Sequence, residues 1–463
     1  MKIIKIYRRP IKNILIFSAV CLFIIAALSM SPNSNTISYK GNIVNKKFPS
    51  QPNIIIFLAD DFGYEIPAYT GGQSYLTPNL DFMAANGIQF TNAYSHPDGF
   101  PSRLALQTGK YNIRNYTLWG TLPAGEKTIG NMLHDAGYAT CFVGKWNMDG
   151  GDSTIHRAGY DNYSVFMPFA NNDNDAEFRH QYISPNIYQN GNFLPASQTA
   201  GKYSEDLYFK YVTDFIDNNG SQPFFIFYAM NLPRSPFAPT PDDPEYVGFN
   251  PDTAVVDNKK YFPGMVAYLD KTIGKMLTKL EANGIAQNTV ILFCADNATT
   301  KVITSLYNGK VTRGGKNLTS QPGTRTPLEV YWPGTVAPAQ ISNTLIDYTD
   351  FLPTLADIAG VPVPANNGVL DGISFYDNLV GTAGVDRSSV YCYWDNSPND
   401  TLKPIRYIND ANYKLYKDTS GVKNFYRLST DINEKHSVPD SSLKPNEIII
   451  KQNFETQIDG IHK

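Results

Sequence analysis

The sequence is poor in cysteine, histidine and charged residues. Only 4 of its 463 residues are cysteine, 6 are histidine, and charged residues make up 17%. So few cysteines exclude a small scaffold held together by disulfides. The formal net charge of −3 gives no basic footprint for nucleic acid. Apolar residues reach 42% and aromatic residues 13%, which is enough for a large buried core and excludes a disordered chain.

The first 30 residues differ from the rest in charge and hydropathy. They carry five Lys and Arg side chains, no acid, and an apolar run over residues 14–30, so the remaining chain has a formal charge of −8. This pattern is typical of a secretory signal peptide or a signal anchor. The run is shorter than the roughly 20 residues that span a bilayer, which favours cleavage. We predict a signal peptide or anchor over 1–30, a polar linker over 31–51, and an exported protein. Its location would be periplasmic or extracellular, with membrane attachment only if the leader is retained.

Three cysteines remain in the body of the chain, at Cys141, Cys294 and Cys392. Each lies in an apolar stretch, where a thiol behaves as a small hydrophobic side chain. An odd number of cysteines in separate apolar runs gives no clear disulfide pairing. We therefore predict three buried free thiols.

Strand and helix patterns alternate between about residues 52 and 365. Continuous apolar runs predict buried strands, and capped amphipathic stretches predict helices. The predicted strands are 53–58, 138–143, 223–230, 289–294 and 327–332, and the predicted helices are 77–86, 128–136, 205–218 with Ser204 as its cap, 261–282 and 348–359. Alternation of this kind indicates an α/β domain over 52–365, with helices covering both faces of its sheet.

The pattern changes in the C-terminal region, 366–463. Short strands separated by turns follow one another at 389–394, 405–409, 413–418 and 424–428. Runs of this kind favour antiparallel pairing between neighbours. We predict a small antiparallel subdomain with little helix.

Two predicted strands end in the same way. The strand over 53–58 runs into Asp60 and Asp61, and the strand over 289–294 runs into Asp296 and Asn297. Ligands of open α/β sheets bind beyond the carboxyl ends of the strands. Three carboxylates and one amide converging there would form an all-oxygen site for Ca²⁺ or Mg²⁺. The alternative is that these side chains cap the turns that follow the strands.

Three basic residues lie where they could bind an anion near this site. Pro101 and Ser102 suit the start of a helix, so residue 99 would lie just before a helix N-terminus, which favours anions. Arg103 lies in the first turn, Lys145 directly follows a strand, and Lys316 lies in a glycine-rich loop. Together they could pair with a bound oxyanion. Taken singly, each could also be an ordinary solvated side chain.

The chain resembles a sulfatase of the alkaline phosphatase superfamily in the order and spacing of several motifs. These are the Asp60-Asp61 strand end, Pro101-Ser102-Arg103 with Leu106-Gln107-Thr108-Gly109, Gly144-Lys145-Trp146, Ser235-Pro236-Phe237, Asp296-Asn297, Gly314-Gly315-Lys316 and Asp350-Phe351-Leu352-Pro353-Thr354-Leu355. The resemblance implies a large mixed, mostly parallel sheet sandwiched by helices, with a smaller C-terminal antiparallel-sheet subdomain. It also implies that the four strand-end residues bind a divalent cation, usually calcium, and that the three basic residues surround a sulfate.

The sequence departs from the family at the positions that carry the chemistry. The family signature begins with a Cys or Ser that becomes formylglycine, the nucleophile, but Gly99 stands there and no formylglycine is expected. Two family histidines, which assist the intermediate and the leaving group, match Asn147 and Arg234. Asn does not titrate and Arg is a poor proton donor at neutral pH. The standard mechanism therefore lacks its nucleophile and both acid–base groups.

Two functions remain open, so whether the chain is an enzyme is also open. The first is a degenerate sulfatase that binds a sulfated or other anionic small molecule or glycan without cleaving it. The second is a hydrolase of sulfuric, phosphoric or phosphonic esters with another nucleophile, such as a metal-bound water or Asp98. For the second, His96, His156 or His180 could transfer protons, although each is also explained as a packing or surface residue.

Overall fold

The computed structural model describes residues 51–169, 179–364, 368–395 and 404–462. The predicted signal segment, nearly all of the predicted linker and the predicted boundary at residue 365 lie outside these ranges. Within them, no helix combines the length and the hydropathy needed to cross a bilayer.

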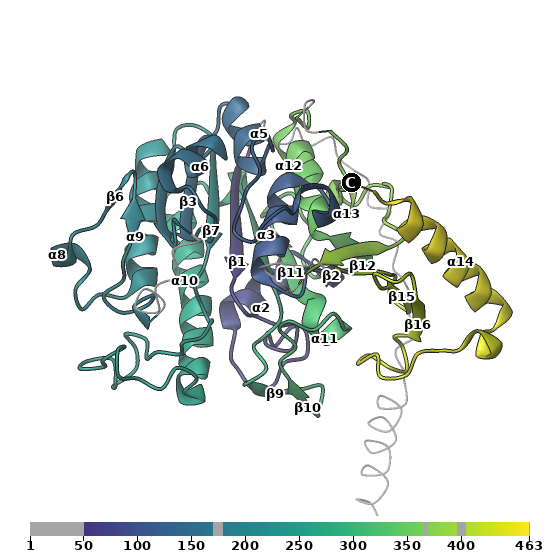
Figure 1. The fold of residues 1–463 in the computed structure, drawn as a ribbon. Helices are drawn as coiled ribbons and strands as arrows, with labels where there is room; N and C mark the ends of the chain where they lie inside the picture. The colour runs from purple at the N-terminus through teal and green to yellow at the C-terminus, as the bar shows by residue number, and fades with distance from the viewer. Residues whose placement is uncertain (1–50, 170–178, 365–367, 396–403, 463) are drawn as a thin grey trace, which may run out of the picture. The chain divides into compact units, whose positions relative to one another are not determined.

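A ten-stranded sheet forms the centre of the α/β region (Figure 1). Its strands lie in the order β12 (Gln340–Asp347), β2 (Ile88–Tyr94), β11 (Arg325–Tyr331), β8 (Thr289–Ala295), β1 (Asn53–Ala59), β7 (Phe224–Ala229), β3 (Ala139–Lys145), β4 (Asn162–Phe166), β5 (Tyr188–Gln189) and β6 (Asn192–Phe193). The five strands from β8 to β4 pair in parallel, whereas β11 runs antiparallel to both of its neighbours. The predicted mixed, mostly parallel sheet is therefore confirmed.

Helices connect these strands, and two short strands form a separate hairpin. The α-helices of this region are α2 (Pro78–Ala85), α3 (Gly99–Thr108), α4 (Asn112–Asn115), α5 (Ile129–Asp135), α6 (Gly151–Arg157), α8 (Ala196–Thr199), α9 (Ser204–Asn219), α10 (Phe262–Ala282), α11 (Gln321–Thr324), α12 (Phe351–Ala359) and α13 (Tyr376–Val380). The hairpin consists of β9 (Thr304–Tyr307) and β10 (Lys310–Arg313), and short 3₁₀ turns are η2 (Lys259–Tyr261), η3 (Ala286–Asn288) and η4 (Tyr348–Asp350).

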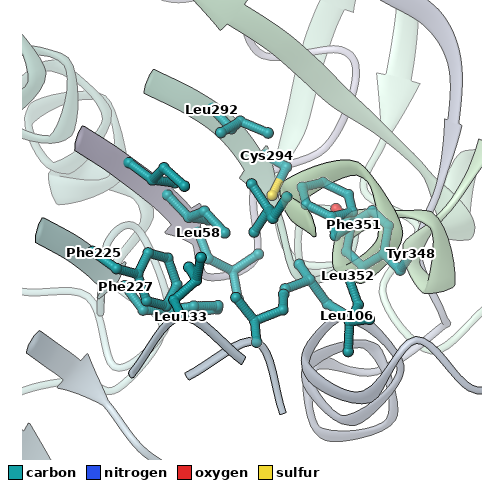
Figure 2. Close-up of a cluster of buried hydrophobic side chains, with 14 of the residues drawn as sticks. Leu58, Leu106, Leu133, Phe225, Phe227, Leu292, Cys294, Tyr348, Phe351 and Leu352 are labelled. Atoms are coloured by element: carbon teal, nitrogen blue, oxygen red, sulfur yellow. The ribbon is translucent and has the colours of Figure 1, made fainter. Parts of the chain in front are cut away.

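Apolar layers cover both faces of the sheet. Alternate residues of β1 belong to different core clusters, because successive side chains of a strand point to opposite faces. One cluster packs under α3, α5 and α12, and Figure 2 shows Leu58, Leu133 and Leu352 among its members. The other packs under α2, α9 and α10. The continuous apolar runs of the sequence correctly predict strands buried on both faces.

A second, four-stranded antiparallel sheet forms in the C-terminal region. It contains β13 (Val390–Trp394), β14 (Ile405–Asn409), β15 (Tyr413–Lys417) and β16 (Lys423–Arg427) in that order. The predicted antiparallel sheet is confirmed, but the prediction of little helix is wrong. After the turn η5 (Asp440–Ser442), the 16-residue α14 (Pro445–Gly460) packs on this sheet through Phe454 and Ile458. The apolar stripe of α14 is narrow, because most of the helix surface is polar. The helical periodicity of its apolar residues is therefore weak in the sequence.

The structure also corrects the predicted cap of α9 and confirms the prediction for the cysteines. Ser204 is the first residue of α9 rather than its cap, because Tyr203 is extended and bridges to Ile183. The Ser204 backbone N–H instead donates to the Tyr182 carbonyl at 2.8 Å. The cysteines of the described residues are free and buried, as predicted.

Candidate functional site

Three carboxylates meet at the carboxyl ends of β1 and β8. The two strands are paired through Ala59 and Ala295, so Asp60 and Asp296 leave the sheet side by side. Asp61 has a φ of 61°, and its backbone N–H donates to Asp296 Oδ1 at 3.2 Å. One oxygen atom from each carboxylate lies within 4.8 Å of the others. All three residues are buried. We call Asp60, Asp61, Asp296 and the adjacent Asn297 the carboxylate cluster.

The donor set of this cluster fits a hard divalent cation. Asn297 Nδ2 donates to Asp61 Oδ1 at 2.7 Å, which leaves Asn297 Oδ1 directed elsewhere. That oxygen and Asp60 Oδ1 are buried and accept no hydrogen bond among the described residues. Buried oxygen atoms without a partner are costly, and carboxylate and amide oxygens are the usual ligands of Ca²⁺ and Mg²⁺. Asp60, Asp61 and Asp296 could therefore hold such a cation, with Asn297 as a fourth ligand.

Each of the three basic residues predicted to bind an anion forms its shortest ion pair with a different member of the cluster. The pairs are Lys145 Nζ to Asp60 Oδ2 at 2.5 Å, Lys316 Nζ to Asp61 Oδ1 at 2.7 Å, and Arg103 Nη2 to Asp296 Oδ2 at 2.9 Å. The tertiary structure thus brings together residues that are 85 to 255 positions apart in the chain. The carboxylates of the cluster balance the charges of these three residues.

The pKa values within the cluster are displaced in opposite directions. Burial acts to raise the pKa of Asp60, but the charges of Lys145 and Arg234 outweigh it and lower that pKa. Burial and the neighbouring Asp60 raise the pKa of Asp296, against the effect of Arg103. Burial and Arg234 lower the pKa of Lys145 to about 8. Opposite charges lower the pKa of Asp60, whereas burial and like charges shift the pKa values of Asp296 and Lys145. A divalent cation would relieve the repulsion between the carboxylates.

Position 99 faces the cluster directly. Gly99 is the first residue of α3, whereas the sequence predicted it just before the helix. The cap is instead Asp98, whose side chain accepts a hydrogen bond from the Phe100 N–H at 3.3 Å. A Cβ atom placed on Gly99 would lie 2.2 Å from Asp296 Oδ2 and 3.2 Å from Asn297 Oδ1. Any side chain at position 99 would therefore point at the cluster. With glycine there, the Asp296 carboxylate lies in that space.

Arg103 lies one turn further along α3 and is 2% exposed. Its Nε and Nη2 atoms both donate to Asp296 Oδ2, at 3.2 and 2.9 Å, and its Nη1 donates to the Lys145 carbonyl at 3.1 Å. The guanidinium group thus ties α3 to the ends of β8 and β3. This geometry holds the face of α3 that carries Gly99 against the cluster.

Asn147 and Arg234, which the resemblance predicts to replace two histidines, occupy different environments. Asn147 follows Lys145 by two positions, is buried, and has a φ of 55°. Arg234 follows β7, and its Nε lies 3.9 Å from Asp60 Oδ2. Burial would lower the pKa of Arg234, but Asp60 and Asp61 raise it. The side chains of Arg234 and Lys316 are 18% and 22% exposed, whereas the carboxylate cluster is buried. An anion that approaches the cluster from solvent would therefore meet these two side chains first.

The other candidates for proton transfer lie elsewhere or are otherwise engaged. The Nε2 atoms of His156 and His180 lie 3.3 and 3.0 Å from Asp152 and Asp252, which are outside the cluster. His96 is buried, and burial lowers its pKa to about 4, so its ring is neutral at neutral pH. Both ring nitrogens of His96 are buried and have no hydrogen-bond partner among the described residues.

Sequence reasoning missed a basic cavity next to the cluster. It has a volume of about 890 Å³ and lies between the loop after β1, the β9–β10 hairpin and α11. The Asn308-Gly309 pair is a strong hairpin signal, and the basic residues that flank it could have drawn attention to the segment. Their convergence with Arg325 and Lys435, however, depends on the tertiary structure.

Comparison with known proteins gives two family matches along the chain. The family model described as Sulfatase matches residues 52–361. A model described as N-sulphoglucosamine sulphohydrolase, C-terminal, matches residues 315–461. The N-acetylgalactosamine-6-sulfatase of Mus musculus is 30% identical over 375 residues, covering 74% of this chain and 69% of the relative. Arylsulfatase A of Homo sapiens is 28% identical over 399 residues, covering 80% and 75%.

Solved structures share the fold. The crystal structure of Ps i-CgsB in complex with k-i-k-neocarrahexaose is similar with a TM-score of 0.71 and 26% identity, covering 88% of this chain and 92% of that one. The structure of BT4656 in complex with D-glucosamine-2-N,6-O-disulfate has a TM-score of 0.71 at 19% identity, covering 88% and 97%. The second likeness concerns the fold alone.

Proposed function

Because the chain belongs to the sulfatase family, we propose that it is a degenerate member that binds a sulfated or other anionic ligand without cleaving it through formylglycine. The observation that carries this proposal is the position of Gly99. Its backbone faces the carboxylate cluster, but it has no side chain, and the Asp296 carboxylate lies where a Cβ atom would be. Neither an aldehyde nor an alkoxide can form at this residue.

The acid–base groups of the family mechanism are missing from the same site. Asn147 cannot exchange a proton, and the raised pKa of Arg234 keeps its guanidinium protonated. One general acid or base contributes roughly 10²–10⁴-fold to the rate of a hydrolase. Loss of two such groups together with the nucleophile supports binding rather than turnover.

The cation we propose for the cluster is Ca²⁺, with Mg²⁺ as the alternative. Asp60, Asp61, Asp296 and Asn297 would hold it through oxygen atoms, two of which have no hydrogen-bond donor among the described residues. When bound, the cation would supply positive charge that attracts and orients an anionic group. Lys316 and Arg234, the partly exposed basic side chains of the site, would bind the anion at its entrance.

The proposed ligand is a sulfated sugar or glycan. Support comes from Ps i-CgsB, whose structure is described in complex with k-i-k-neocarrahexaose and which is 26% identical to this chain. The basic residues at the site suit sulfate, since charge-assisted hydrogen bonds to such oxyanions are strong. We further propose that the protein is exported by its leader, as a periplasmic or extracellular protein. Mass spectrometry of the N-terminus from fractionated cells tests cleavage against retention.

The first experiment measures cation binding and turnover on the same preparation. After chelation and dialysis, calorimetric titration with CaCl₂ should show one site, which Asp296→Asn weakens at least tenfold. Asp214→Asn, at an exposed carboxylate outside the cluster, is the matched control and should bind as the wild type does. With Ca²⁺ present, 4-nitrocatechol sulfate should not be hydrolysed. Multiple turnovers at neutral pH would overturn the proposal and favour a hydrolase with a different nucleophile.

The second experiment restores the missing groups. The triple variant Gly99→Cys, Asn147→His and Arg234→His is coexpressed with a formylglycine-generating enzyme. Gain of sulfatase activity would support the view that only these three positions separate the chain from an active enzyme. The single variants Asn147→His and Arg234→His, which lack a nucleophile, are the controls and should stay inactive.

A further inference from the structure

Arg234 lies on a short turn that follows β7 and reaches the carboxylate cluster. The Arg234 backbone N–H donates to the Asn231 carbonyl at 3.2 Å, which closes the turn. The Leu232 carbonyl accepts from the Asp60 N–H at 3.0 Å, so the turn is also bonded to the first residue of the cluster. The Arg234 Nε atom lies 3.9 Å from Asp60 Oδ2, beyond the range of a direct hydrogen bond. The position of residues 231–234, which we call the Arg234 turn, therefore helps to fix where the guanidinium group lies.

Tyr182 holds the Arg234 turn through two backbone carbonyls. Its hydroxyl oxygen lies 2.7 Å from the Asn231 carbonyl and 2.7 Å from the Arg234 carbonyl, so one O–H donor is shared between two acceptors. Tyr182 is 1% exposed, and its ring stacks on that of Tyr203 with the ring centres 5.9 Å apart. Burial raises the pKa of Tyr182 well above its usual range, so the hydroxyl keeps its proton and remains a donor at neutral pH.

Glu205 holds the same turn through a backbone N–H. Its Oε1 atom accepts from the Asn231 N–H at 3.0 Å, and its Oε2 atom accepts from the Tyr228 hydroxyl at 2.8 Å. Glu205 is fully buried in the first turn of α9. The N–H of the preceding Ser204 donates to the Tyr182 carbonyl at 2.8 Å, so the two supports of the turn are bonded to each other. Buried side chains therefore hold both the N–H and the carbonyl of Asn231.

A buried carboxyl group and a buried hydroxyl are costly means of holding a turn in place. Removing polar groups from water is unfavourable unless hydrogen bonds compensate for it, and apolar groups of the same shape can often replace a buried hydrogen-bonded pair at little cost. Both groups nevertheless converge on the turn that carries Arg234, one of the partly exposed basic side chains of the site. Exceptions to such local rules are expected at functional sites. The placement therefore indicates a role in the site as well as in stability.

We propose that Tyr182 and Glu205 are positioning residues for Arg234. By holding the carbonyl and the N–H of Asn231, they fix the place from which the Arg234 guanidinium meets a bound anion, and they thereby set the affinity of the site for a sulfate group. The inference rests on the proposed function and deepens it, because it assigns to anion binding two residues that lie outside the carboxylate cluster.

The first test measures the affinity for a sulfated hexasaccharide from κ-carrageenan by calorimetry in the presence of Ca²⁺. Tyr182→Phe removes only the hydroxyl that bridges the two carbonyls, and it should weaken binding by about three- to tenfold, the usual effect of losing one hydrogen bond. Glu205→Leu should weaken binding similarly. Glu205→Gln can keep both contacts through its amide group and should restore the affinity of the wild type.

The matched control is Tyr160→Phe, on the opposite face of the sheet. The buried Tyr160 hydroxyl donates to Gln107 Oε1 at 2.9 Å, so this variant also loses one buried hydrogen bond. It should lose stability but keep the affinity of the wild type. Affinities are compared at a temperature at which circular dichroism shows each variant to be folded. If Glu205→Leu does not fold, Tyr182→Phe alone decides the test.

A double-mutant cycle distinguishes positioning from a general loss of structure. If Tyr182 acts through Arg234, Tyr182→Phe should weaken binding in the wild type but not in the Arg234→Ala background. Equal weakening in both backgrounds would overturn the positioning role and leave the proposed function standing. An unchanged affinity of Tyr182→Phe in the wild-type background would overturn it too.

A second measurement needs no ligand. In protein with isotope-labelled arginine, the Nε–H resonance of Arg234 is identified as the one that Arg234→Lys removes. We expect Tyr182→Phe to shift this resonance, and Glu205→Gln and Tyr160→Phe to leave it in place. A resonance that Tyr182→Phe does not move would overturn the proposal. A shifted resonance in a protein that does not bind the hexasaccharide would support the positioning of Arg234 and count against the proposed function.

Discussion

Gly99 has no side chain, and the Asp296 carboxylate occupies the space where a Cβ atom would lie. That carboxylate receives two hydrogen bonds from Arg103, so moving it breaks contacts that hold α3 to β8. We predict that Gly99→Ala lowers the free energy of unfolding of the cation-free protein by about 1–3 kcal/mol, as overpacking of a dense interior does. Urea denaturation in the presence of a chelator measures the change.

The control for this prediction is another glycine near the start of a helix. Gly264 lies in the first turn of α10, and a Cβ atom added there meets no atom within 4 Å. Gly264→Ala should therefore leave stability unchanged or raise it by about 0.5–1 kcal/mol, since Ala favours the helix. Equal effects of the two substitutions would contradict the close packing at position 99.

Glu205 is a second residue whose surroundings make a measurable prediction. Burial raises its pKa from 4.5 to about 7, against hydrogen bonds from the Tyr228 hydroxyl at 2.8 Å and the Asn231 N–H at 3.0 Å. The folded state then binds the proton more tightly than the unfolded state. Protonated Glu205 therefore stabilises the folded state fully below pH 4.5, and this stabilisation is lost as the pH rises through about 7. The free energy of unfolding should fall by about 3 kcal/mol over this range.

Glu205→Gln should remove this pH dependence. The amide oxygen can accept from Asn231, and the amide nitrogen can donate to the Tyr228 oxygen, so both contacts survive without a titrating group. The unfolding free energy of the wild type minus that of the variant should therefore fall between pH 4.5 and 7. A difference that stays constant over this range would show that Glu205 is not protonated in the folded state.

At the scale of elements, α14 shows how a narrow apolar stripe anchors a helix. Ile458 is fully buried against the C-terminal sheet, whereas Ile449 on the same helix is 60% exposed. We predict that Ile458→Ala lowers the unfolding free energy by about 2–5 kcal/mol, the usual cost of emptying a buried Ile site. Ile449→Ala, the matched control, should change it by less than about 0.5 kcal/mol. Thermal denaturation of both variants distinguishes the two positions.

Helices and strands with a strong apolar pattern in the sequence were predicted well, and those with a weak pattern were not. β1 and β8 are unbroken apolar runs, and their side chains are buried on both faces as the sequence predicts. The helix α14 went unpredicted because Phe454, Ile458 and Glu447 are its only fully buried positions. The start of α9 was misplaced because a bridge between Ile183 and Tyr203, rather than a serine cap, determines where the helix begins. The local sequence around Ser204 does not indicate such a distant contact.

At the scale of the whole molecule, the cluster joins two strand ends that are 235 residues apart in the chain. A cation that binds only the folded chain stabilises it by mass action, by about 2.7 kcal/mol at a concentration one hundred times its dissociation constant. We predict that Ca²⁺ raises the midpoint of thermal unfolding and that a chelator reverses the effect. The midpoint of Asp296→Asn should respond far less. A midpoint that is independent of Ca²⁺ would contradict the proposed cation site.

The sequence alone determined the chemical identities at the site and the architecture around it. The carboxylates that follow two buried strands, the basic residues of the motifs, and the glycine at position 99 can all be read without coordinates, because residue identity and apolar periodicity are local properties. Only the tertiary structure decided how these groups pair. It placed Lys145, Lys316 and Arg103 on the carboxylates, put Asp296 in the space beside Gly99, and gathered basic residues from separate segments of the chain around one cavity. Coulombic and steric effects depend on the distances between atoms, and for segments hundreds of residues apart only the packing of the sheet and its loops fixes those distances.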